Sequence, residues 1–162
     1  MSTALYEVLD RLGIAYRQHD HEAAFTVEQA DRIYGHLPGT HTKNLFLRNK
    51  KGDRHYLLVV PSGKRVDLKA LRTVVGESTL SFASPERLMK YLGVTPGAVT
   101  PLGLIHDRER AVCILLDRDL LAAEALNFHP LRNTATLALA RADFQRFLEH
   151  QGNEVRVLEL PL

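Results

Sequence analysis

One segment of the chain, HTKNLFL, places a lysine and an asparagine side by side where an apolar run begins. Lys43 and Asn44 stand at the predicted entrance to a strand. An ammonium group next to a carboxamide offers several hydrogen-bond donors, which suits the binding of a phosphate or a carbonyl group. A lysine that is simply solvated at the start of a strand explains the same two residues equally well.

A second segment, GVTPGAVTPLGL, is punctuated by glycine and proline. Gly97 and Gly103 allow the backbone to approach a ligand closely, and Pro101 stiffens the loop. Such a loop can direct backbone N–H groups at an oxyanion that develops during a reaction. Turn geometry alone is the alternative explanation for these residues.

A third segment, NFHPLRNTAT, contains a histidine before a proline. Pro130 favours extended backbone at His129 and so fixes the position from which the imidazole ring projects. A purely structural histidine and a site residue are equally good interpretations of this pattern.

Basic residues gather between positions 43 and 65, where Asp53 is the one acidic residue. They indicate either a solvated hairpin tip or an edge that faces phosphate groups. The whole chain has 21 Lys+Arg and 19 Asp+Glu, a net charge of +2, which neither requires nor excludes a nucleic-acid partner. The candidates for phosphate contacts are Arg48, Lys50, Lys51, Lys64 and Arg65.

Other chemistries find little support. The chain has no phosphate-binding P-loop, no dinucleotide-binding glycine motif and no nucleophile elbow. Its one cysteine, Cys113, excludes an internal disulfide and is expected to be buried and inert within AVCILL. The eight histidines lack the spacing of a metal site, so we interpret them as scattered surface residues and expect neither a metal nor a cofactor.

Apolar periodicity, caps and turn residues predict a mixture of helices and strands. Helices are expected over residues 3–12, 26–34, 67–75, 84–92, 119–125 and 142–150, and strands over residues 14–18, 44–48, 54–61, 104–106, 111–116, 134–140 and 155–160. The turns KKGD and DRER each join two of these strands as hairpins, which makes antiparallel pairs. The expected fold is therefore a single α+β domain over residues 1–162 with a mixed sheet.

The 162-residue chain is 45% hydrophobic and 25% charged, the ordinary mix of a globular protein. None of its apolar stretches approaches the ~20 residues that span a bilayer. The N-terminus carries acidic residues and lacks the apolar run of a secretory signal. We therefore expect a cytoplasmic protein that does not associate with membranes.

Taken together and in order, TKNLFLRNKKG, GVTPGAVTPLGL and LNFHPLRNTATLAL resemble the YbaK-type aminoacyl-tRNA editing family. This family includes the editing domain inserted in bacterial prolyl-tRNA synthetases. The similarity extends from FTVEQA near residue 25 to the final helix and is greatest to free-standing members that deacylate Ala-tRNA(Pro). The resemblance implies a mixed, partly barrel-like sheet flanked by helices, and hydrolysis of the alanyl ester without a metal.

The resemblance also implies roles for individual residues. Lys43 matches the lysine that the family requires, and Gly97 and Pro101 match its G-x-x-x-P motif, so we expect Lys43 and Gly97 to be catalytic. His129 matches a histidine that lines the aminoacyl pocket, and it is expected to bind substrate together with Asn44, Pro101 and Gly103.

The partners implied by the resemblance are the acceptor end of tRNA(Pro) carrying a mischarged amino acid, and prolyl-tRNA synthetase. Two alternatives stay open. One is deacylation of another small aminoacyl group, such as cysteine or serine. The other is a non-catalytic module that binds tRNA or a synthetase.

Overall fold

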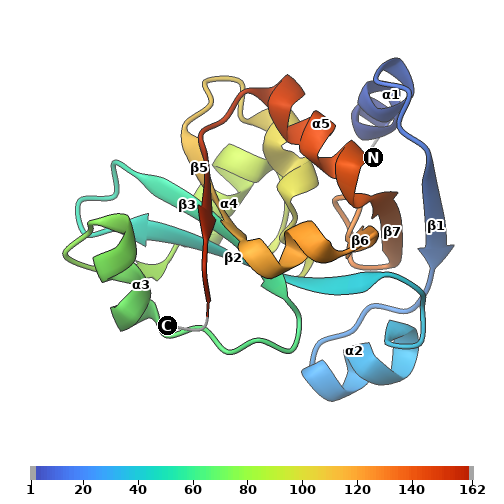
Figure 1. Cartoon of the computed structure of the whole chain (residues 1–162), viewed down its shortest axis with the longest axis horizontal. Coiled ribbons are helices and arrows are strands. Elements are labelled where there is room, and N and C mark those ends of the chain that lie inside the picture. Colours follow the sequence, from blue (N-terminus) through green and yellow to red (C-terminus); the bar gives the residue numbers. More distant parts are fainter. Residues whose placement is uncertain (1–2, 161–162) are drawn as a thin grey trace.

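The computed structural model describes residues 3–160, which form a mixed sheet flanked by helices (Figure 1). The helices are α1 (Thr3–Arg11), α2 (Val27–Tyr34), α3 (Leu68–Val75), α4 (Pro85–Leu92) and α5 (Arg141–Gln151), with short 3-10 helices η1 (Pro96–Ala98), η2 (Pro101–His106) and η3 (Arg118–Ala122). The strands are β1 (Tyr16–Asp20), β2 (Thr40–Asn49), β3 (His55–Pro61), β4 (Leu80–Phe82), β5 (Val112–Asp117), β6 (Ala125–Phe128), β7 (Ala135–Ala140) and β8 (Val155–Leu158).

The eight described strands follow the order β1-β7-β6-β2-β3-β5-β8, with β4 paired to β2 off this path. The pairs β2–β3, β2–β4, β6–β7 and β1–β7 are antiparallel, whereas β2–β6, β3–β5 and β5–β8 are parallel. The predicted α+β class with a mixed sheet is therefore confirmed. Strand β2 lies at the centre, and its ladder pairing with β6 consists of Thr40 and His41.

Two hydrophobic cores lie on opposite faces of the sheet, because successive side chains of a strand point to opposite sides. In β3, Leu57 and Val59 pack into the larger core with side chains of α1, α4 and α5. Leu58 and Val60 pack into the smaller core under α3. Burial on both faces explains why β3 reads as a continuous apolar run rather than an alternating one.

The predicted strand over 104–106 is wrong. These residues belong to η2, which Pro101 opens and the Thr100 side chain caps by accepting a hydrogen bond from the Leu102 N–H. Leu104 is buried in the larger core, so its apolar character reflects packing of a helical turn and not a strand. The hairpin predicted around the turn DRER is therefore absent from the described residues. The second antiparallel pair formed by consecutive strands is β6–β7.

The elements around residue 120 also differ from the prediction. The helix expected over 119–125 is the shorter η3, and the chain then enters β6, a strand that the sequence did not predict. The three-residue strand β4 was likewise not predicted. Within residues 3–160, no helix combines the length and apolar character needed to cross a membrane.

Candidate active site

A cavity of about 600 Å³ lies where the first residues of β2 meet α2, β6 and β7. Its volume falls within the usual range of small-molecule sites. Its polar lining includes His41, Lys43, Asn44, Asn127, His129 and Thr136. The structure therefore brings together three of the residues singled out in the sequence: Lys43, Asn44 and His129.

Lys43 lies near the start of β2, opposite Val60 of β3. Its ammonium group donates a hydrogen bond to the backbone carbonyl of Lys64. None of the ion pairs found among residues 3–160 includes Lys43. Lys43 therefore has no carboxylate within ion-pair distance among the described residues, although Glu28 and Asp31 also line the cavity.

His129 reaches the cavity from the end of β6. Its Nδ1 lies 2.9 Å from the carbonyl oxygen of Ala135. Because a carbonyl can only accept, Nδ1 carries the proton and Nε2 of the neutral ring is left as an acceptor. Burial lowers the pKa of His129 below its ordinary value, against the opposing effect of the Ala135 carbonyl, and His21 and His41 lower it further. At neutral pH the ring is therefore neutral.

Three histidines gather around the half-buried ring of Tyr34 on α2. The ring centroid of Tyr34 lies 4.5 Å from that of His21, 5.9 Å from that of His41 and 5.8 Å from that of His129. The interpretation of the histidines as scattered surface residues is wrong for these three. No sequence spacing could have revealed the cluster, because its members come from separate elements that only the tertiary fold brings together. Among residues 3–160, no three His, Cys, Asp or Glu side chains are placed to hold a metal ion.

Several polar atoms of the cavity lining are buried without a hydrogen-bond partner among the described residues. They are Nε2 of His41 and the Oδ1 atoms of Asn44 and Asn127. Nδ1 of His41 faces the amide nitrogen of Asn127 at 3.3 Å and so accepts, which leaves a proton on Nε2. Three residues of the cavity lining therefore each hold a buried polar atom that lacks a partner among the described residues. Buried polar groups are rarely left unpaired, so this pattern favours a polar ligand.

The glycine–proline loop does not join this cavity. Gly97 is exposed in η1, and its φ lies outside the left-handed region. A Cβ at Gly97 would lie 3.0 Å from Nδ2 of Asn133, so the glycine packs against the segment that follows His129. Pro101 and Gly103 are buried, and a Cβ at Gly103 would lie 2.6 Å from the Leu92 carbonyl oxygen. These two residues are therefore part of the packing between η2 and α4.

The candidate phosphate-binding residues divide between two places. Lys64 and Arg65 follow β3, and the Lys64 backbone contacts Lys43 at the cavity. Lys50 and Lys51 are exposed in the turn between β2 and β3. A strand rises about 3.3 Å per residue, which puts this turn roughly 20 Å from Lys43.

Lys64 is bound within the protein rather than presented to solvent. Its ammonium group lies 2.6 Å from Asp117, whose side chain is fully buried, and 2.7 Å from Asp119. Burial alone would lower the pKa of Lys64, but the two carboxylates outweigh it and the pKa is raised. Lys64 is therefore not part of the surface available to phosphate groups.

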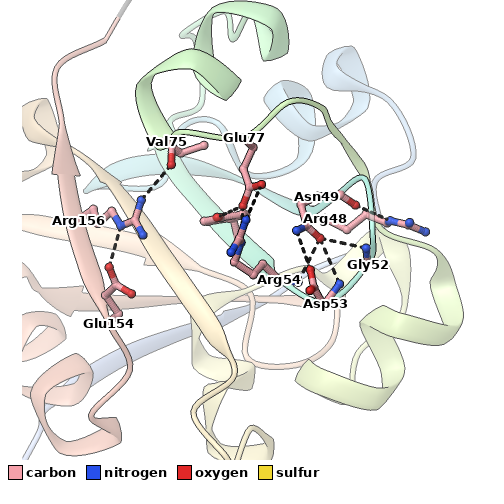
Figure 2. A network of polar contacts seen from close by, with 10 residues as sticks. Arg48, Asn49, Gly52, Asp53, Arg54, Val75, Glu77, Glu154 and Arg156 are labelled. Carbon is pink, nitrogen blue, oxygen red and sulfur yellow. Dashed lines mark hydrogen bonds and ion pairs between the residues drawn. The ribbon is translucent and has the colours of Figure 1, made fainter.

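The turn between β2 and β3 is organised by Asn49 (Figure 2). Its Oδ1 accepts hydrogen bonds from the backbone N–H groups of Gly52, Asp53 and Arg54 at 3.0–3.1 Å. The Arg54 guanidinium pairs with Glu77 at 2.7 Å, while the Arg48 side chain points away from that pair. The two arginines lie on opposite faces of the hairpin, as strand alternation requires.

The chain belongs to the aminoacyl-tRNA editing domain family, whose model matches residues 21–147. It is 37% identical over 157 residues to the prolyl-tRNA editing protein ProX of Acetoanaerobium sticklandii, covering 97% of this chain and 96% of that protein.

A vertebrate relative and a solved structure agree with this assignment. The prolyl-tRNA synthetase associated domain-containing protein 1 of Danio rerio is 40% identical over 147 residues, covering 90% of this chain and 79% of that protein. A crystal structure described as a candidate trans-editing enzyme for prolyl tRNA synthetase superposes with a TM-score of 0.69 at 24% identity, covering 99% of both chains. At that identity, the superposition establishes the shared fold.

Proposed function

We propose that this protein is a trans-editing hydrolase that removes alanine from mischarged Ala-tRNA(Pro). The observation that carries the proposal is the relation to ProX, a prolyl-tRNA editing protein, along almost the whole length of both chains. The polar cavity at the start of β2 supports it, because its volume exceeds what an alanyl group needs and leaves room for the terminal ribose.

The reaction adds a water molecule to the carbonyl carbon of the aminoacyl ester. The bond between this carbon and the ribose oxygen then breaks, which releases alanine and regenerates the free hydroxyl of tRNA(Pro). Lys43 is suited to bind the ester carbonyl or the negatively charged 3′ end through charge-assisted hydrogen bonds. Asn44 and the acceptor Nε2 of His129 are suited to orient the amino and hydroxyl groups of the substrate.

The role proposed for Gly97 is positional. Its contact with Asn133 shapes the segment that begins at His129, and a larger residue there would press on that segment. Arg48, Lys50, Lys51 and Arg65 supply positive charge for the phosphates of the tRNA.

An editing site of this kind compensates for the limited ability of a synthetase to discriminate between amino acids. A pocket built for proline can exclude larger side chains but admits a smaller one, since a methylene or two changes binding by only ~1–3 kcal/mol. A second site that accepts alanine and is too small for proline removes the error. The whole chain, residues 1–162, would act as this one domain in the cytoplasm, with prolyl-tRNA synthetase as a second partner.

Release of alanine from Ala-tRNA(Pro) by catalytic amounts of the purified protein tests the proposal. Cys-tRNA(Pro), Ser-tRNA(Pro) and Pro-tRNA(Pro) serve as matched substrates. We expect alanine to be released fastest and proline to be retained. Faster release of cysteine or serine would reassign the substrate. Binding of tRNA(Pro) without any release would identify a non-catalytic module and overturn the proposal.

A further inference from the structure

Two arginines converge at the turn between β2 and β3, on the face that α4 covers. A Cβ built on Gly52 would lie 3.1 Å from Nη2 of Arg48 and 2.8 Å from Nη2 of Arg87. Arg48 comes from the last part of β2 and Arg87 from the first half of α4. Two guanidinium groups from separate elements therefore lie close to one point of the backbone.

Neither guanidinium group is neutralised within the described chain. Of the ion pairs among residues 3–160, none includes Arg48, Arg87 or the nearby exposed Lys90. Arg48 donates to the backbone carbonyls of Asn49 and Lys50, at 3.1 and 2.8 Å. The opposite face of the same hairpin behaves differently, because Arg54 there is paired with Glu77 (Figure 2).

The positive charges of this cluster affect the pKa of a buried histidine, His55. Arg87 donates to the Gly52 carbonyl and to Nε2 of His55, both at 2.9 Å, so Nε2 accepts and the ring is neutral. Burial lowers the pKa of His55 to about 4, with further lowering from Arg87, Arg48 and Lys90. These like charges are held together without a compensating carboxylate, an arrangement that an anion would stabilise.

We propose that Arg48 and Arg87 together bind one phosphate group of the tRNA backbone, an assignment of ligand that rests on the editing function proposed above. Guanidinium groups match the geometry of phosphate oxygens and are weakly hydrated, which makes arginine the preferred residue for such contacts. The exposed Lys50, Lys51 and Lys90 extend the positive surface around the pair.

The pair lies apart from the cavity. Arg48 is five residues beyond Lys43 along β2, which corresponds to roughly 17 Å of strand, and this odd spacing directs the two side chains to opposite faces of β2. A tRNA that contacts both must therefore extend from one face of β2 to the other. The arginine pair would thus hold the tRNA at a point remote from the ester, where the contact is independent of which amino acid is attached.

Binding of uncharged tRNA(Pro) at several salt concentrations tests this inference without requiring any deacylation. We expect Arg48→Gln with Arg87→Gln to weaken binding about 10- to 100-fold and to reduce the salt slope of log K by about 0.7–0.9. Arg118→Gln is the matched control, because Arg118 pairs with exposed Glu159, and it should keep the wild-type affinity and slope. An unchanged slope in the double variant would overturn the inference, whereas failure to release alanine would count only against the editing function.

A second measurement uses the unsubstituted protein and so does not depend on the variants folding. Modification of arginines by phenylglyoxal, read by mass spectrometry, should be suppressed by tRNA at Arg48 and Arg87 but not at Arg118. Equal modification of Arg48 and Arg87 with and without tRNA would contradict the assignment. Suppression by free inorganic phosphate at the same concentration would assign the pair to a small anion instead of a nucleic acid and would also overturn it.

Discussion

Replacement of Lys43 by alanine is the perturbation that tests the cavity most directly. In the folded protein the ammonium group makes one hydrogen bond to the Lys64 carbonyl at the cavity wall, where water can replace it. Loss of this charge-assisted bond costs at most about 1.5–3 kcal/mol of stability, and each kcal/mol corresponds to about 2–4 °C in Tm for a chain of this size. Lys43→Ala should therefore remain folded at assay temperature.

The effect of Lys43→Ala on deacylation should be much larger. A hydrogen bond to a charged group contributes about 1.5–3 kcal/mol, which corresponds to about 10- to 150-fold in rate when the group acts on the transition state. Single-turnover release of labelled alanine from Ala-tRNA(Pro), normalised to the folded fraction, measures it. Lys69→Ala, which removes an exposed lysine of α3, is the control and should keep the wild-type rate. A wild-type rate for Lys43→Ala would refute the assignment of Lys43 to the reaction.

Three further variants separate catalytic from structural roles. Gly97→Ala should leave Tm nearly unchanged but lower the single-turnover rate, by about 10²-fold at most, through pressure on Asn133; an unchanged rate would make the loop a scaffold only. Lys64→Met should cost about 3–5 kcal/mol in denaturant unfolding because it leaves Asp117 buried without its partner, and a stable variant would contradict this ion pair. Since the pKa of His55 is about 4 in the folded protein, below its ordinary 6.5, the unfolded chain takes up a proton first as the pH falls. The free energy of unfolding should drop by up to about 3 kcal/mol between pH 6.5 and 4, and His55→Gln should remove that drop; an identical pH profile in the variant would exclude His55 as its source.

Much of the fold could be predicted from local signals. The cap at Asp67 and the left-handed glycine at Gly76 bound α3 as the sequence indicates, because both depend on contacts within a few residues. The misassigned segment at 104–106 shows that local signals do not always identify the type of element. Its apolar residues are buried by contact with α4 and the core, and burial alone does not distinguish a strand from a helical turn.

The candidate site was likewise predicted only in part from the sequence. Lys43, Asn44 and His129 were identified from their neighbours in the sequence, and the structure places them around one cavity. Tyr34 was missed, because nothing in its sequence context shows that three histidine rings surround it. Lys64 had the sequence context of a surface lysine, but its true partner, Asp117, lies in a different strand and becomes a neighbour only through the β3–β5 pairing.

The central position of β2 has a consequence for the order in which the protein assembles. Its pairing with β3 closes a short loop, which costs little chain entropy and can form early. Other parts of the cavity lining come from β6 and β7, and β7 pairs with β1, so they require contacts between segments more than 100 residues apart in the sequence. During synthesis the hairpin with its basic turn therefore emerges well before the histidine side of the cavity. A nascent chain can present charge to RNA before it has a pocket in which to hydrolyse an ester.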